Sequence, residues 1–211
     1  MTAFAPFRPN NRRVATPRIV SASRPTTTVD VFDSDLGWIA VAAGGHRLVG
    51  VTFGHACQAD AVAALESQGY IDAAAARSSA PSVDSEDGWL ADLRERFKSF
   101  AAGEFEDFRD VTIDVSHLTP FERSVVQACR AIPYGETKSY GELATKVGRD
   151  GAARAVGRVM ATNRFPLVVP CHRVLAAGGG LGGYSAPQGL SMKRKLLAME
   201  AGVSGRPRRA K

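Results

Sequence analysis

Two helix-start signatures follow one another in the second half of the chain. The segment TPFE (119–122) combines a hydroxyl N-cap, a proline at the first helical position and a glutamate three residues after the cap. The segment SYGE (139–142) repeats the hydroxyl and the glutamate. The second signature predicts a short helix that ends near Gly148, and another helix is expected over about 152–162. Closely spaced helices of this kind indicate a helix-turn-helix.

Small residues form a stripe on the last of these helices. Ala153, Gly157 and Ala161 are spaced four apart, and so are Arg154 and Arg158. A glycine costs a helix about 1 kcal/mol relative to alanine, so a close approach to this face is expected in compensation. Tight contact with a DNA backbone and tight packing within the protein both explain such a stripe.

The upstream half has a different pattern. The segment 38–54, WIAVAAGGHRLVGVTFG, predicts two strands joined by a glycine turn. A short helix over 61–67, a loop over 69–88, a helix over 90–100 and a strand over 111–115 are expected to follow. This half is therefore an α/β unit, and it shows no cluster of catalytic residues.

Composition narrows the class of protein. The chain has 211 residues, of which 45% are hydrophobic, so it can bury a core. No run is long enough to span a bilayer, and no secretory signal is visible, so we expect a soluble intracellular protein. Its 3 cysteines include no CxxC pair. Neither a disulfide framework nor a four-cysteine zinc site is therefore indicated.

Charge is distributed unevenly around a net value of +6. Residues 1–29 hold five arginines and no acid, and residues 151–211 hold eleven basic side chains and one acid, Glu200. A basic half of this kind favours a polyanionic partner such as nucleic acid, although a solvated basic surface also explains it. We expect residues 1–30 to be disordered. A targeting segment and a DNA-binding arm stay open for them.

A cysteine and a histidine stand side by side in VVPCHRVLAAGGGLGGYSAP (168–187). Residues 165–170 predict a buried strand, which places Cys171 at its end. Neighbours in extended backbone point to opposite sides, so His172 is expected to reach the thiol through water rather than directly. Glu200 is the candidate partner that orients the histidine, with a salt bridge to a nearby lysine (Lys193 or Lys195) as the alternative.

A metal site is another interpretation of the Cys-His pair. Adjacent residues bind one metal only with awkward geometry, and no second cluster at ligand spacing is present, so we predict no metal. The glycines that follow are expected to form a loop that carries Tyr184 and Ser185. This loop is not a P-loop, because the Gly-Lys-Ser/Thr ending is absent. On its residues alone, Cys171 remains a candidate nucleophile or a structural residue.

These residues together resemble a known family. The segments RAVG (154–157), PCHRV (170–174), GYS (183–185) and LLAME (196–200), with Asn163, closely resemble the O6-alkylguanine-DNA alkyltransferases. These proteins are also called methylated-DNA-protein-cysteine methyltransferases. The resemblance is continuous over about residues 118–202, and PCHRV is a highly specific motif.

The resemblance implies roles for the residues around the cysteine. Cys171 would accept the alkyl group from O6 of guanine irreversibly, so that each molecule acts once. His172 would be the water-mediated base, oriented by Glu200. Asn163 would support the network beneath the nucleophile, and Tyr140 would help to protonate N3 of the departing guanine.

The resemblance also implies a base pocket and a DNA-binding helix. Val174, Tyr184, Ser185 and Lys193 would line the pocket. Arg154 would occupy the space of the extruded nucleotide in the DNA stack. A second set of residues would meet the minor groove, where small side chains allow close approach: Ala153, Gly157 and Arg158. Phosphate attraction is expected from the lysine and arginine side chains of the segment 193–195 and from the tail.

The predicted architecture is an α/β N-terminal domain followed by a mostly α C-terminal winged helix-turn-helix domain. We divide the chain into a disordered basic extension (1–30), the α/β domain (31–115), a DNA-binding and alkyl-acceptor domain (116–203) and a basic tail (204–211). We expect a cytoplasmic, nucleoid-associated or nuclear monomer that needs no cofactor and binds double-stranded DNA. An organelle-targeting role for the first segment stays open.

The predicted function is DNA repair by suicide transfer of an alkyl group from O6-alkylguanine, and in some cases O4-alkylthymine, after nucleotide flipping. One alternative is a non-enzymatic reader of alkylated DNA that recruits other repair proteins. Another is a winged-helix regulator in which the Cys-His pair is structural. The presence of Cys171 favours transfer over the reader.

Overall fold

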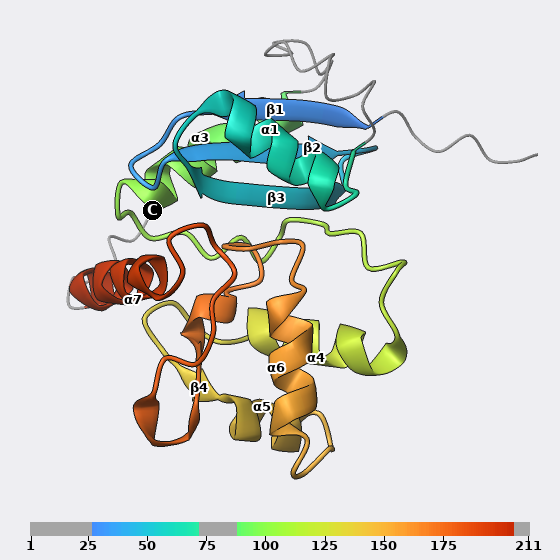
Figure 1. Cartoon of the computed structure of the whole chain (residues 1–211), viewed down its shortest axis with the longest axis vertical. Helices are drawn as coiled ribbons and strands as arrows, with labels where there is room; N and C mark the ends of the chain where they lie inside the picture. Colours follow the sequence, from blue (N-terminus) through green and yellow to red (C-terminus); the bar gives the residue numbers. More distant parts are fainter. Residues whose placement is uncertain (1–26, 72–87, 205–211) are drawn as a thin grey trace, which may run out of the picture.

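The computed structural model describes residues 27–71 and 88–204 (Figure 1). Its first element is a three-stranded antiparallel sheet of β1 (Thr28–Phe32), β2 (Trp38–Ala43) and β3 (Leu48–His55), in that order. The predicted hairpin is confirmed. The expectation of disorder up to residue 30 is wrong at its end, because β1 begins at Thr28 and pairs along β2. The rest of that segment, residues 1–26, lies outside the described residues.

Two helices cover the two faces of this sheet. Helix α1 (Gln58–Ser67) lies on one face, and α3 (Trp89–Ala101) lies on the other (Figure 1). Strand β2 alternates accordingly, because Ala40 and Ala42 pack in the cluster of α1, whereas Ile39 and Val41 pack in the cluster of α3. Both helices agree with the sequence prediction. Most of the predicted loop between them, residues 72–87, lies outside the described residues.

The strand predicted over 111–115 is wrong. Only Ile113 forms a bridge, a parallel one with Leu48 at the start of β3. The outer edge of β3 is shared with a second segment, because the Val51 amide donates to the Arg164 carbonyl at 2.8 Å. Little edge is therefore left for a longer ladder.

Four helices dominate the second half of the described chain: α4 (Pro120–Arg130), α5 (Tyr140–Lys146), α6 (Ala153–Ala161) and α7 (Leu190–Ser204). Both predicted capping boxes are present. Thr119 and Ser139 accept hydrogen bonds from the amides of Glu122 and Glu142, whose carboxylates bond back to the cap amides. The helix pattern was therefore predictable from local sequence.

The segment before Cys171 is a set of turns and not the predicted strand. The Val169 amide donates to the Phe165 carbonyl and the Cys171 amide to the Val169 carbonyl, each at 2.7 Å. Leu167 has φ of 74°, which no strand accommodates. A short 3-10 helix, η1 (Cys171–Arg173), follows and leads into β5 (Val174–Leu175).

Strand β5 pairs in parallel with β4 (Lys138–Ser139), directly before α5. One buried apolar cluster runs from the α3 face of the sheet into the helices of the second half, where it includes Cys129. The architecture is thus an α/β part followed by a mostly helical part. Across the described ranges, no helix is both long and apolar enough to cross a membrane.

Candidate active site

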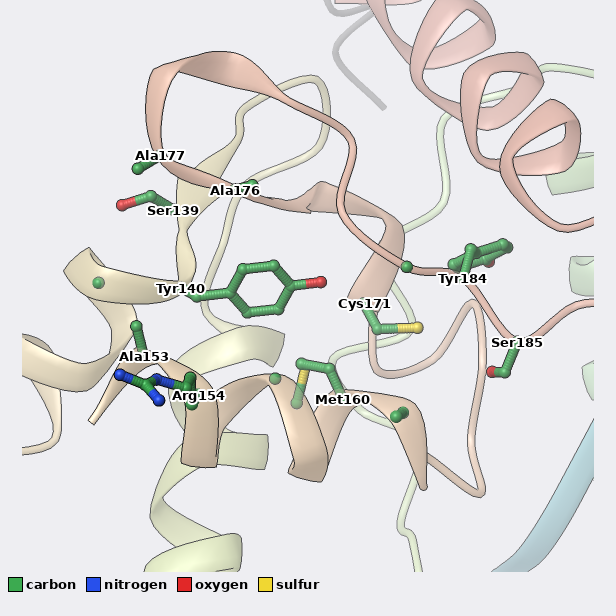
Figure 2. A pocket seen from close by; sticks show the side chains of 14 residues that line it. Ser139, Tyr140, Ala153, Arg154, Met160, Cys171, Ala176, Ala177, Tyr184 and Ser185 are labelled. Carbon is green, nitrogen blue, oxygen red and sulfur yellow. The ribbon is translucent and has the colours of Figure 1, made fainter. Parts of the chain in front are cut away.

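A cavity of about 600 Å³ opens between α5, α6 and the loop that follows β5 (Figure 2). Its lining is made mostly of small and apolar residues. The residues that line it are Ser139, Tyr140, Gly141, Ala153, Arg154, Gly157, Met160, Ala161, Cys171, Ala176, Ala177, Gly183, Tyr184 and Ser185. Seven of the predicted site residues therefore meet around one hollow, although they come from separate segments.

Cys171 lies at the wall of this cavity and is 5% exposed. Its sulfur accepts a hydrogen bond from the Asn163 side-chain amide at 3.3 Å. The same amide nitrogen donates to the Val169 carbonyl at 2.9 Å, and the Asn163 oxygen accepts the Phe165 amide at 3.0 Å. Asn163 thus ties the cysteine to the turns before it. Burial raises the pKa of the Cys171 thiol, against the lowering effect of Asn163, so the resting side chain is protonated at neutral pH.

His172 and Glu200 form a buried pair behind the cysteine. The His172 Nε2 and the Glu200 Oε1 are 2.7 Å apart, and both side chains are at most 1% exposed. Burial lowers the pKa of His172, although the Glu200 carboxylate opposes this effect. A neutral imidazole whose Nε2 donates to Glu200 leaves Nδ1 as its basic nitrogen. No described protein group bonds to Nδ1.

Arg173 is the second partner of Glu200. Its Nε lies 2.9 Å from the Glu200 Oε2, and its Nη2 lies 2.9 Å from the Glu200 Oε1. The Gly135 amide also donates to Oε2 at 3.1 Å. Burial raises the pKa of Glu200, but the bonds from His172 and Arg173 overcome this and lower it to about 2. The alternative of a salt bridge from Glu200 to Lys193 or Lys195 is wrong.

Lys193 is fully buried, so the expectation that it attracts phosphate is wrong. Its ammonium donates to the carbonyls of Val174 and Leu181 at 2.6 and 2.5 Å. It fastens the glycine loop to β5, and neither Lys193 nor Val174 is among the lining residues of the cavity. Lys195 donates to the Asp35 carbonyl at 2.7 Å and therefore contacts the α/β part of the molecule, which is called the sheet half below (residues 31–115).

Tyr140, the first residue of α5, extends its hydroxyl toward the Cys171 side of the cavity (Figure 2). Burial raises the pKa of this phenol. A Cβ atom on Gly157 would lie 3.9 Å from the Tyr140 ring, whereas one on Gly182 would lie 3.0 Å from its hydroxyl. The missing side chain at Gly182 therefore leaves room for the tyrosine hydroxyl, whereas a Cβ on Gly157 would make only an ordinary contact. Tyr184 and Ser185 form the wall beside Cys171 (Figure 2).

The two arginines of α6 occupy different surroundings. Arg154 lines the cavity with Ala153 and Gly157, which are predicted DNA-binding residues. Arg158 lies outside it and lines a separate hollow with Thr119 and Glu122 at the start of α4. The spacing of four residues put both arginines on one side of the helix, but only Arg154 reaches the site.

Sequence reasoning missed several residues of the site. One of them is Arg173, a basic neighbour of His172 in a region that has one acid, Glu200. The local sequence did not indicate that its side chain points toward Glu200. The other lining residues that were not predicted as site residues are small or apolar, and their chemistry gave no signal: Ser139, Gly141, Met160, Ala161, Ala176, Ala177 and Gly183. Among the described residues, no group of three or more potential ligands could hold a metal ion.

Comparisons with known proteins agree with this arrangement. Residues 120–202 match the family model described as 6-O-methylguanine DNA methyltransferase, DNA binding domain. A methylated-DNA–protein-cysteine methyltransferase from Mycolicibacterium paratuberculosis is 44% identical over 119 residues, which are 54% of this chain and 70% of the relative.

Solved structures extend the likeness to the upstream half. The Mycobacterium tuberculosis O6-methylguanine methyltransferase has a TM-score of 0.65 and 33% identity over 87% of this chain and 97% of its own. The M. tuberculosis OGT solved in complex with DNA has a TM-score of 0.62 and 30% identity over 83% and 93% of the two chains. Fold and site thus define a methyltransferase with a DNA-binding domain. The chain belongs to the methylated-DNA–protein-cysteine methyltransferase family.

Proposed function

We propose that this protein repairs DNA by transferring an alkyl group directly from O6 of guanine to the sulfur of Cys171. The observation that carries the proposal is the position of that sulfur, which lines an apolar cavity in front of the buried His172–Glu200 pair. A flipped guanine requires such a hollow, and a buried thiol requires a base. Reaction with O4-alkylthymine is a further expectation for the same hollow.

The chemical step follows from the protonation states. The Cys171 proton passes through a water molecule to Nδ1 of His172, which is the free basic nitrogen of the pair. The sulfur then attacks the alkyl carbon, the carbon–O6 bond breaks, and its electron pair leaves with guanine. Tyr140 supplies a proton to guanine N3. The thioether on Cys171 is stable, so each molecule reacts once.

DNA binding is assigned to the helical half, residues 116–203, as a domain separate from residues 31–115. Helices α5 and α6 form the helix-turn-helix, and the β4–β5 pairing forms the small sheet beside it. Arg154 occupies the gap in the DNA stack, while Ala153 and Gly157 allow the minor-groove backbone to approach. Arg158 contacts phosphate outside the cavity. Extrusion costs a few kcal/mol, which these contacts offset.

The test uses a duplex oligonucleotide that carries a single O6-methylguanine. The peptide containing Cys171 is expected to gain the mass of one methyl group, and Cys171→Ser should abolish the gain. Cys57→Ser is the matched control, because Cys57 is the exposed thiol among the described residues and should not be required. A protein that binds the lesion with its Cys171 peptide unmodified would instead be a reader of alkylated DNA.

A further inference from the structure

Glu200 is shared between two cationic or potentially cationic side chains, and Arg173 makes more contacts with the carboxylate than His172 does. Arg173 contacts both carboxylate oxygens through Nε and Nη2 at 2.9 to 3.1 Å. His172 contacts one oxygen through Nε2. The three side chains are 3% exposed or less, so water does not screen them.

Arg173 is itself held rigidly. Its Nη1 donates to the Ile132 carbonyl at 2.9 Å, and its guanidinium lies over the Tyr134 ring at 5.3 Å. Arg173 belongs to η1, and both of these contacts come from the turn after α4. Together they fix the orientation of the guanidinium that faces Glu200. The arginine does not line the cavity, so any effect on the reaction is exerted through its partners.

A buried carboxylate next to a histidine ordinarily favours the imidazolium form. An imidazolium has no free lone pair and cannot accept the proton of Cys171. An arginine on the same carboxylate removes this bias, because it supplies a permanent positive charge. The charge of Glu200 is then balanced without a proton on His172 Nδ1, and Glu200 still orients the ring through Nε2.

We propose that Arg173 is a positioning residue for alkyl transfer: it neutralises Glu200 and thereby keeps His172 uncharged and able to accept the thiol proton. The inference rests on the proposed function, in which His172 is the base. This role differs from a purely structural one, because Arg173 would control whether His172 is protonated.

The other charged and titratable groups around His172 agree with this assignment. Lys193 of α7 adds a second positive charge nearby and also lowers the pKa of His172. Tyr134 and Tyr184 face the same cluster, and burial raises the pKa of both phenols, so they are neutral at physiological pH. Cys129 of α4 is likewise a neutral thiol, because burial raises its pKa. Glu200 is therefore the negative group that these charges balance.

The decisive variants are Arg173→Gln, which removes the charge, and Arg173→Lys, which keeps it. The rate of Cys171 alkylation is measured against pH with free O6-benzylguanine, so that DNA binding does not enter. In Arg173→Gln the pKa of His172 should rise, so imidazolium persists to higher pH. The rising limb of the profile, where the rate increases with pH, should therefore shift to higher pH by about 1 to 3 units. In Arg173→Lys it should stay near the wild-type position.

A double variant and a distant control separate charge from packing. Arg173→Gln combined with Glu200→Gln removes both charges, so the limb should return toward the wild-type pH even though the rate is lower. Arg109→Gln changes an exposed arginine that does not line the cavity, and it should leave the profile unchanged. A slower reaction in Arg173→Gln with the limb unmoved would show a structural role only and overturn the inference.

Imidazole nitrogen NMR of the wild-type protein provides a measurement that does not depend on the folding of any variant. His172 should remain neutral, with its proton on Nε2, to below its ordinary pKa of about 6.5. A positively charged His172 in the wild-type protein at neutral pH would refute the inference, even if methyl transfer occurs. A wild-type protein that transfers no methyl group from lesion DNA would instead refute the proposed function.

Discussion

Three cysteines of this chain occupy three environments. Cys57 is exposed before α1, Cys129 is buried in α4, and Cys171 is buried but lines the cavity. Exposure alone would select Cys57 as the reactive thiol. Cys171 differs from the other two because it combines three features: a cavity that can hold the electrophile, a hydrogen bond from Asn163, and the His172–Glu200 pair behind it as a general base. The environment, and not the accessibility of the thiol, therefore sets its proposed reactivity.

Arg154 offers a prediction at the scale of one residue. Arg154→Ala should slow repair of a methylated duplex by at least tenfold, because the gap left by the flipped nucleotide is no longer filled. The reaction with free O6-benzylguanine should change much less. Single-turnover rates on the two substrates provide the measurement, with Arg158→Ala as the comparison outside the cavity. Equal losses on both substrates in Arg154→Ala would contradict the extrusion role.

Which residues belong to the site was largely predictable, whereas the orientations and contacts of their side chains were not. Cys171, His172 and Glu200 stood out because they are rare chemical groups in a basic region. The positions of Arg173 and Lys193 depend on how η1 and α7 pack, and both side chains are buried by contacts between segments. The expectation that Lys193 attracts phosphate and lines the base pocket requires an accessible ammonium, and lysine is ordinarily exposed. Two backbone carbonyls satisfy it instead.

At the scale of elements, the helices were predicted correctly from local sequence, whereas two strands that depend on distant partners were not. The helices α4 and α5 were predictable because each carries its own capping box. The strands over 111–115 and 165–170 were not, because a strand needs a partner edge that local sequence does not reveal. The second of these segments is buried as turns, so its apolar pattern reflects burial and not extension.

The glycine loop yields a prediction for an element. Gly182 has φ of 68°, and a Cβ there would lie 3.0 Å from the Tyr140 hydroxyl. Gly182→Ala should therefore lower the free energy of unfolding by about 1 to 2 kcal/mol and displace the tyrosine, which slows alkyl transfer.

Urea unfolding and the rate of methyl transfer test this prediction. Gly183→Ala is the matched control for stability, because a Cβ at Gly183 meets nothing within 4 Å and its φ is not positive. If the two alanine variants are equally stable, the proposed constraint at Gly182 does not operate.

At the scale of the whole molecule, the described residues of the sheet half do not line the cavity, but they hold the segments that build it. The Val51 amide binds the carbonyl of Arg164, in the turns before Cys171. The Gln188 side chain donates to the Gly54 carbonyl, and Lys195 donates to the Asp35 carbonyl. One apolar cluster continues through both halves. The site is therefore supported from across the boundary between the two proposed domains.

This arrangement predicts that the two halves unfold together. Both tryptophans, Trp38 and Trp89, lie in the sheet half, whereas buried Cys129 reports on the helical half. Tryptophan fluorescence and the labelling of Cys129 should show the same urea midpoint. Cys129→Ala provides the labelling control. Two separate midpoints would show that the halves are independent folding units.

The burial of the Glu200 carboxylate together with His172 and Arg173 has a consequence for ionic strength. Dissolved ions screen charges that face solvent, and they reach a sealed cluster poorly. Added salt should therefore weaken the docking of the protein on DNA, which depends on exposed arginines, and leave the proton balance behind Cys171 nearly unchanged. Salt would thus govern how often the protein meets its lesion and have little influence on how fast it reacts once there.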